Sequence, residues 1–154
     1  MIQNNTVKEY IEGIINTSGF AVLATEGNGQ PHVSLIAITP PGNCRELLFA
    51  TYRNSIKYRN IKCNNKVALL FENKDISEKE ITERVVLTII GYTEELNISA
   101  NDEASLAHLR RHPGMESFML SPDCTLIKII AQSYQVVKGI DDIRWITAEN
   151  LDII

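Results

Sequence analysis

The stretch LLFATYRNSIKYRNIKCN (residues 47–64) joins a short apolar run to a polar and basic segment with helical spacing. The apolar residues 47–50 predict a buried strand, and Asn54 or Ser55 is suited to cap the helix that follows. A helix leaves its first backbone N–H groups without intrahelical partners. The stretch therefore predicts a strand, a turn and a helix N-terminus with free hydrogen-bond donors.

Two hydroxyls and two cations alternate across this junction: Thr51, Arg53, Ser55 and Lys57. A phosphate suits such a place, because the helix dipole, the free N–H groups and the cations all favour negative charge. The pattern alone leaves a second interpretation open, a solvated helix start that carries basic side chains. On the pattern alone this second interpretation is the more common one.

The composition is that of one globular domain, which we expect to span residues 1–154. Apolar residues make up 44% and charged residues 22% of the chain, and the net charge is −4. No broad basic face is expected, so the chain predicts no nucleic-acid partner. Three cysteines without C-x-x-C spacing indicate neither disulfides nor a thiolate zinc site. Reduced cysteines predict a cytoplasmic location. We expect no signal peptide and no membrane span.

Apolar runs and turn residues predict six strands and three helices. Gly91 lies inside the fifth run and predicts a bulge. The charged residues 73–83 predict a solvated connection, and the tail 139–154, with Trp145, is expected to pack on the rest. The strands are expected at 20–25, 31–39, 46–51, 66–72, 84–96 and 124–138, and the helices at 6–17, 55–64 and 99–112, with a further helical turn at 115–120.

Short links between successive strands imply antiparallel pairing, and six strands with outer helices suggest a small closed or partly closed barrel. The sequence therefore predicts an α+β fold that is mainly β.

Residues that could carry chemistry by themselves are few. His108 and His112 have the i, i+4 spacing of a metal pair, but two arginines between them would repel a cation, so we expect surface histidines and no metal site. His32 is expected at the barrel rim, and Cys44, in a turn beside Arg45, as an inert thiol. Such a chain suits an enzyme whose cofactor carries the reaction, and it suits a plain binding module equally well.

Four segments in this order and spacing resemble the FMN-binding split-barrel family related to pyridoxamine 5′-phosphate oxidase. They are FAVLATEG (20–27), GQPHVS (29–34), LFAT (48–51) and SIKYRNI (55–61), and the resemblance covers about residues 7–138. It implies a six-stranded antiparallel split β-barrel with peripheral helices. It also implies a homodimer with one FMN in each of two clefts at the subunit interface.

The resemblance assigns roles to positions of this chain. Thr51, Ser55 and Lys57 match the positions that hold the FMN phosphate. Arg53 or Arg59 would supply the charge that the oxidase often carries where this chain has Ile56. The strand residues that would line the ribityl chain and the ring are Val33, Ser34, Leu35 and Ile36, together with Ala50.

The chain also departs from the oxidase proper. Val85 or Val86 stands where the oxidase has a glutamine near the flavin, and residues 141–145 do not match its C-terminal segment that grips the substrate phosphate. We therefore expect no synthesis of pyridoxal phosphate. Trp145 or Phe118 of the partner subunit could close the cleft, with ordinary packing of these aromatic residues as the alternative.

The function expected from the sequence is that of an FMN-dependent oxidoreductase with a small organic substrate and NAD(P)H as a candidate electron donor. One alternative is a non-catalytic flavin carrier or sensor. A haem-binding relative, with His32, His108 or His112 as the ligand, is a further alternative.

Overall fold

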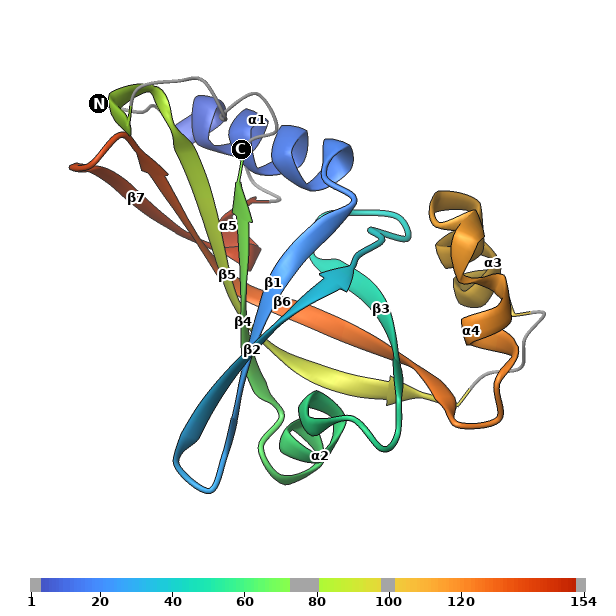
Figure 1. Cartoon of the computed structure of the whole chain (residues 1–154). Helices are drawn as coiled ribbons and strands as arrows, with labels where there is room; N and C mark the ends of the chain where they lie inside the picture. Colours follow the sequence, from blue (N-terminus) through green and yellow to red (C-terminus); the bar gives the residue numbers. More distant parts are fainter. Residues whose placement is uncertain (1–3, 73–80, 98–101, 152–154) are drawn as a thin grey trace.

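The computed structural model describes residues 4–72, 81–97 and 102–151. Their strands form one antiparallel sheet in the order β2-β1-β4-β5-β6-β3, and β7 also pairs with β6 (Figure 1). This is the mainly-β, barrel-like fold with peripheral helices that the sequence predicts. The strands are β1 (Phe20–Gly27), β2 (Gln30–Ala37), β3 (Glu46–Tyr52), β4 (Lys66–Glu72), β5 (Val85–Leu96), β6 (Cys124–Lys138) and β7 (Asp142–Thr147).

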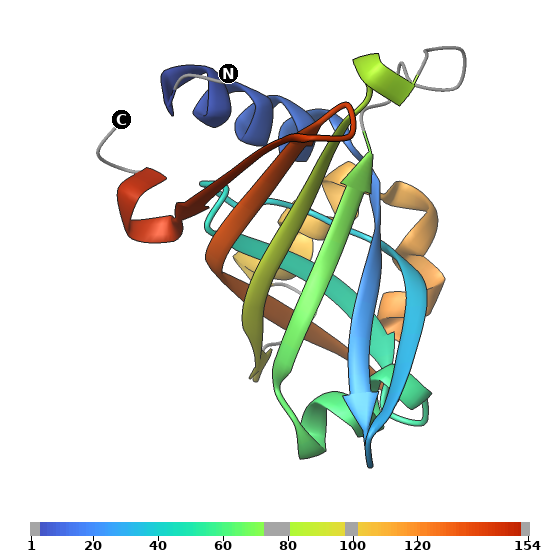
Figure 2. The same ribbon diagram turned by 90° about the vertical axis from the view of Figure 1, so that its left-hand side faces the viewer.

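The sheet curls until its two edge strands approach each other (Figure 2). Just beyond β2, Thr39 forms an isolated bridge with Leu48 of β3, through backbone hydrogen bonds of 2.9 and 2.7 Å. β2 pairs with β1 along its whole length, and β3 pairs with β6 along its whole length. The split of the barrel therefore lies between β2 and β3.

Gly91 allows the two longest strands to bend together. The pairing of β5 with β6 shifts register between Ile90 and Gly91, as the sequence predicts for this position. A Cβ atom at residue 91 would overlap the backbone oxygen of Ile130 and lie 3.3 Å from the Cα of Ala131. Glycine is required here because the neighbouring backbone takes the space of a side chain.

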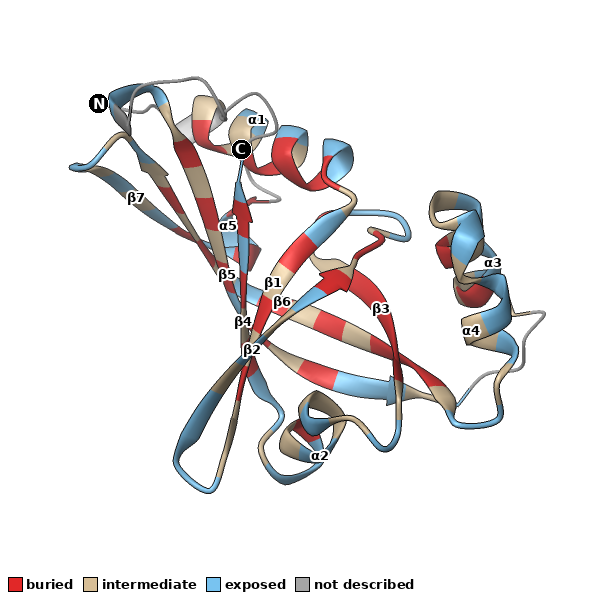
Figure 3. Cartoon of the chain, in the orientation of Figure 1, coloured by how far each residue is buried: buried red, intermediate tan, exposed pale blue. Residues whose placement is uncertain are grey.

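The core fills the barrel and the space beneath the first helix (Figure 3). Tyr134, the largest fully buried side chain, donates a 2.6 Å hydrogen bond from its hydroxyl to the backbone oxygen of Cys44. The buried side chains of β1, β4 and β5 alternate along each strand, as a half-buried sheet requires. Phe20, the first residue of β1, is exposed.

Helices cover the barrel at three places (Figure 1). The first helix packs Val7, Ile11 and Ile15 into the main core. A second, smaller core around Leu48 and Leu126 lies under the helices at the side of β3. The helices are α1 (Asn4–Thr17), α2 (Ile56–Cys63), α3 (Glu103–Arg111), α4 (Glu116–Leu120) and α5 (Ala148–Leu151), with 3-10 turns η2 (Ile81–Glu83) and η3 (Pro113–Met115).

Three predictions of detail differ from the structure. α3 begins at Glu103 with Asp102 as its N-cap, whose carboxylate accepts from the N–H of Ala104 at 3.0 Å. The predicted start of this helix at residue 99, and most of the predicted connection 73–83, lie outside the described residues. The tail forms a strand of its own, β7, which the sequence analysis missed. The tail does pack on the main core, as predicted, through Ile146, Ala148 and Leu151, whereas Trp145 is 54% exposed.

Large apolar side chains line the outer face of the sheet from β2 to β7. Leu35 lies opposite Val22, which lies opposite Leu70, and the row continues through Thr88 and Gln135 to Trp145. The members that are exposed form what we call the outer apolar stripe: Val33, Leu35, Leu70, Ile90, Ile143 and Trp145.

Candidate functional site

A pocket of about 260 Å³ opens at the split of the barrel, where β2, β3 and the start of α2 meet η3 and α4. Six of the nine residues predicted for a cofactor site line it. The lining consists of Leu35, Ile36, Ala37, Ala50, Thr51, Tyr52, Ser55, Lys57, Met115 and Phe118.

The polar end of this pocket is the junction of β3 with α2. Ser55 is the N-cap of α2, and its hydroxyl oxygen accepts a 3.2 Å hydrogen bond from the N–H of Tyr58. The hydroxyls of Thr51 and Ser55 are hydrogen-bonded to each other at 2.9 Å. Lys57 adds the one cation among the lining residues. The first turn of α2 adds unpaired N–H groups, so this end of the pocket favours an anion.

Other residues of the pocket lining are apolar or aromatic. The rings of Tyr52 and Phe118 are in contact, with centroids 4.0 Å apart and an angle of 33° between their planes. Met115 lies beside them in the lining. Phe118 thus reaches the pocket from its own chain, through α4, and the sequence analysis had considered it only as a residue of the partner subunit.

Arg53 does not line this pocket. Its Nη1 donates to the backbone oxygen of Pro122 at 3.1 Å, and its Nη2 lies 3.6 Å from Oε2 of Glu95. The side chain instead borders a separate cavity of about 320 Å³ between β5, β6 and α4. The structure therefore separates Arg53 from Thr51, Ser55 and Lys57, with which the sequence pattern grouped it.

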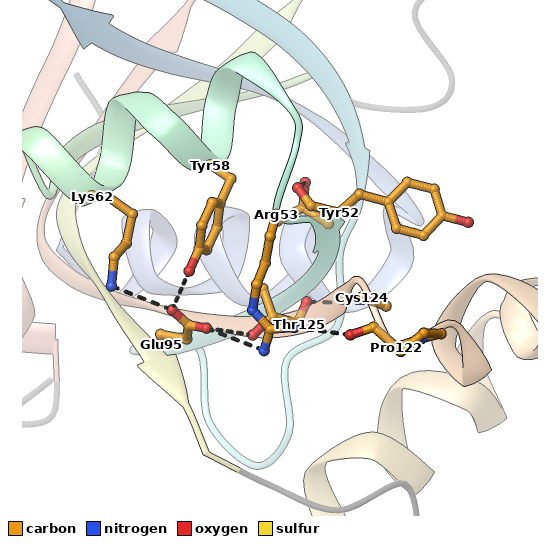
Figure 4. Close-up of polar contacts among 9 residues, drawn as sticks. Tyr52, Arg53, Tyr58, Lys62, Glu95, Pro122, Cys124 and Thr125 are labelled. Carbon is orange, nitrogen blue, oxygen red and sulfur yellow. Dashed lines mark hydrogen bonds and ion pairs between the residues drawn. The ribbon is translucent and has the colours of Figure 1, made fainter.

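Glu95 of β5 is the centre of a polar cluster that the sequence analysis missed (Figure 4). Its carboxylate accepts hydrogen bonds of 2.8 Å from the hydroxyls of Tyr58 and Thr125. Lys62 and Arg53 each place a nitrogen 3.6 Å from it. Partial burial by itself would raise the pKa of Glu95, but these hydrogen bonds and cations outweigh burial and hold the pKa below its usual value. The signal for this cluster in the sequence was a glutamate near the end of a long predicted strand, together with the basic residues of a predicted helix.

Val33 and Ser34 of β2 lie near the pocket without lining it. Val33 points outward on the outer apolar stripe. Ser34 and His32 alternate with it, and among the described residues the Ser34 Oγ and the His32 Nδ1 are buried without a hydrogen-bond partner. Buried polar atoms of this kind call for a ligand or a water molecule.

His108 is fully buried, so the prediction of a surface histidine there was wrong. Its Nδ1 is hydrogen-bonded to the hydroxyl of Thr39 at 2.8 Å, and its Nε2 has no partner among the described residues. Burial, together with the nearby His112, lowers the pKa of His108 to about 4. His112 donates its Nε2–H to the backbone oxygen of Ile38 at 2.9 Å, since a carbonyl can only accept. Both rings thus fasten α3 to the segment after β2.

Residues suited to a metal are not gathered anywhere in the ranges 4–72, 81–97 and 102–151, where no group of three or more His, Cys, Asp or Glu side chains could hold an ion. Cys44 is buried, and burial raises the pKa of its thiol to about 11. This agrees with the inert thiol that the sequence predicts. None of the helices in the described part of the chain is long and apolar enough to cross a membrane.

Comparison with known proteins relates the chain to a family. A family model described as pyridoxamine 5′-phosphate oxidase matches residues 7–138, which is most of the chain. No curated protein matches the sequence. β7 and α5 lie beyond the matched residues.

Solved structures share the fold at low sequence identity. A haem-binding protein from Mycobacterium smegmatis has a TM-score of 0.82 and 16% identity, over 95% of this chain and 60% of that protein. Campylobacter jejuni ChuZ has a TM-score of 0.79 and 17% identity, over 95% and 61%. A protein from Clostridium acetobutylicum related to general stress protein 26, of the pyridoxinephosphate oxidase family, has a TM-score of 0.72 and 18% identity, over 97% and 99%. The chain thus spans about three fifths of the first two proteins and nearly all of the third.

Proposed function

The chain belongs to the pyridoxamine 5′-phosphate oxidase family, and from this premise we propose that it is a cytoplasmic flavoprotein that binds FMN and acts as an oxidoreductase on a small organic substrate. The observation that carries the proposal is the pocket at the split of the barrel. Thr51, Ser55 and Lys57 meet there beside β2 and the first turn of α2.

The phosphate of FMN would bind at the polar end of the pocket. The hydroxyls of Thr51 and Ser55 can turn to donate to phosphate oxygens, and Lys57 supplies a charge-assisted hydrogen bond. No ion pair of Lys57 forms within the described residues, so its charge is available to a ligand. This end of the pocket needs no further cation to prefer a phosphate over a neutral group.

The remainder of the pocket suits the rest of FMN. Ser34 of β2 lies beside the pocket and does not line it; its buried hydroxyl lacks a partner among the described residues and would hydrogen-bond to a ribityl hydroxyl that reaches it. Tyr52, Phe118 and Met115 offer an apolar wall to a flat aromatic ring. Bound FMN would supply transfer of hydride or electrons, while these residues orient the ring and exclude water.

We infer that a second copy of the chain completes the site, and two features of the single chain support this. The pocket of about 260 Å³ is below the roughly 300–1,000 Å³ of sites for ligands of this class. Leu35, at the rim of the pocket, belongs to the outer apolar stripe, and stripes of this kind mark interfaces.

The colour of the purified protein tests the proposal. We expect a flavin absorption spectrum, or its appearance on reconstitution, and release of free FMN on denaturation. Anaerobic addition of NADH or NADPH should then bleach the flavin, and an acceptor should restore it. A colourless protein that does not bind added FMN contradicts the proposal. Flavin that binds but is neither reduced nor turned over with a panel of substrates favours the carrier or sensor alternative.

Haem binding is a second candidate, because a structure of the same fold is described as a haem-binding protein. Two of the three candidate ligands oppose it in this chain. His108 is fully buried against Thr39, and His112 uses its Nε2 on Ile38. Titration with haemin tests this candidate. A Soret band in the wild-type protein that His32→Ala abolishes would establish haem binding. A wild-type protein without a Soret band would exclude it.

A further inference from the structure

The backbone of Arg53 lies in the loop between β3 and α2, at the proposed phosphate site, but its side chain points away from the pocket. It lies two residues from Thr51 and two from Ser55, both of which line the pocket. Its guanidinium nevertheless lies on the other side of the loop, between Glu95 and the backbone oxygen of Pro122 (Figure 4). The Arg53 side chain is long, rotamer-rich and 48% exposed, which leaves other orientations open to its guanidinium.

Glu95 is a fixed and charged partner for Arg53. Hydrogen bonds from Tyr58 and Thr125, each of 2.8 Å, hold its two carboxylate oxygens in place. Lys62 lies 3.6 Å from the same carboxylate. Glu95 therefore stays ionised at neutral pH, and it presents a negative charge beside the loop that carries Arg53.

The contact between Arg53 and Glu95 is a weak one. The nearest nitrogen and oxygen are 3.6 Å apart, and the Arg53 side chain is 48% exposed. Exposed ion pairs contribute little free energy of stabilisation, whereas a guanidinium and a phosphate form two short hydrogen bonds side by side. A phosphate held by Ser55 and Lys57 can thus compete with Glu95 for the guanidinium.

We propose, on the basis of the FMN function above, that Glu95 and the FMN phosphate compete for Arg53. Glu95 is then a positioning residue that sets how strongly the pocket distinguishes FMN from riboflavin. While Glu95 holds Arg53, Lys57 is the one cation of the pocket lining. When the carboxylate is neutralised, Arg53 becomes available as a second.

Glu95→Gln is the test, with Glu94→Gln as the matched control. Glutamine keeps the size of Glu95 and an oxygen that can accept from Tyr58 or Thr125. Glu94 is the next residue of β5, faces the other side of the strand and pairs with Lys128 at 3.6 Å, so its variant makes the same change in net charge. Flavin fluorescence quenching gives the dissociation constants of FMN and riboflavin for each protein, at low and at high salt.

We expect Glu95→Gln to raise the preference for FMN over riboflavin roughly two- to fivefold at low salt. This range corresponds to the free energy of one exposed ion pair, which the variant no longer forms. High salt should remove the gain. Glu94→Gln should leave the preference unchanged, and Glu95→Gln should give no gain in a protein that also carries Arg53→Gln. Thermal unfolding of each variant verifies that it is folded.

Three results would overturn the competition. The first is an equal change of the FMN preference in Glu95→Gln and Glu94→Gln. The second is equally weakened binding of FMN and riboflavin by Glu95→Gln. The third is a gain in FMN preference that persists when the protein also carries Arg53→Gln. A wild-type protein that binds riboflavin and FMN equally also overturns it while leaving flavin binding intact. A wild-type protein that binds neither flavin contradicts the proposed function itself.

Discussion

Lys57 is the residue on which the proposed phosphate site depends most, because it is the cation of the pocket lining. The sequence predicted that Lys57 shares a site with Thr51 and Ser55, from an alternation of hydroxyls and cations after a strand, and all three line one pocket. The same alternation included Arg53, which the structure turns away. Spacing along the chain predicts which residues share a loop. It does not predict which side a long side chain takes, because a carboxylate 42 residues later, Glu95, decides that.

Lys57→Ala should weaken FMN much more than riboflavin, because the lost contact goes to the phosphate. We expect a loss of about 1.5–3 kcal/mol for FMN, the worth of a charge-assisted hydrogen bond. Arg59→Gln is the control, since Arg59 lies on the same helix, is exposed and does not line the pocket. Titration of both ligands measures the difference, and equal weakening of FMN and riboflavin would place Lys57 elsewhere.

His108 predicts a pH dependence of stability. Its pKa in the folded protein is about 4, below the ordinary 6.5, so the unfolded chain binds the proton more readily. The contribution of His108 is therefore complete above pH 6.5 and is lost as the pH falls toward 4. Between pH 7 and pH 5 the loss should reach about 2 kcal/mol in the free energy of unfolding.

Urea unfolding at both pH values measures this loss, and His108→Gln is the comparison. The variant should be less stable at pH 7 but should lack the His108 share of the pH dependence, while all carboxyl groups remain common to both proteins. A His108→Gln variant with the same loss as the wild type would assign the pH dependence to other groups.

Among the elements, the strands were easier to predict than the helices. β6 (Cys124–Lys138) has the predicted bounds, and the bulge at Gly91 was predicted from the residue alone. α3 begins later than expected, at an Asp102 cap. β7 was missed because only one of its six residues, Ile146, is buried, and residues 142–147 acquire strand structure from pairing with β6. Tertiary pairing overrides weak local preference.

Gly91→Ala should destabilise the protein at the element scale, because the added methyl group would overlap the backbone of β6. We expect a cost of about 1–3 kcal/mol, typical of forced overpacking. Gly13→Ala is the control: it lies in α1 with open space around it, and alanine there should stabilise the helix by about 0.5–1 kcal/mol. Chemical denaturation measures both, and equal effects would contradict the steric explanation.

For the whole molecule, the family and the barrel followed from the sequence, and the outer apolar stripe did not. The stripe joins side chains from separate strands, including Leu35, Leu70 and Trp145, and becomes visible only once the registers are known. The histidine pair shows the same limit: the helix spacing of His108 and His112 was clear, but their burial against Thr39 and Ile38 depends on where α3 docks.

Leu35→Lys should convert a dimer into a monomer if the stripe is the interface. Leu120→Lys is a matched control, because the two leucines are 69% and 67% exposed, and Leu120 lies on α4, off the stripe. Both variants should fold, since both side chains are exposed. Sedimentation equilibrium measures the mass. A dimer that persists in Leu35→Lys, or dissociates equally in Leu120→Lys, would move the interface elsewhere.

The order of the strands in the sheet also has a consequence for synthesis on the ribosome. β3 pairs with β6, and Leu47 of β3 lies opposite Ile129, which leaves the ribosome 82 residues later. Until then the apolar strand that begins the phosphate junction has only the bridge at Thr39 to hold it. Closing such long loops makes folding slow and leaves strand edges exposed in the meantime. The pocket proposed for FMN should therefore form late, only after β6 has emerged, and a nascent chain released before β6 should aggregate rather than bind flavin.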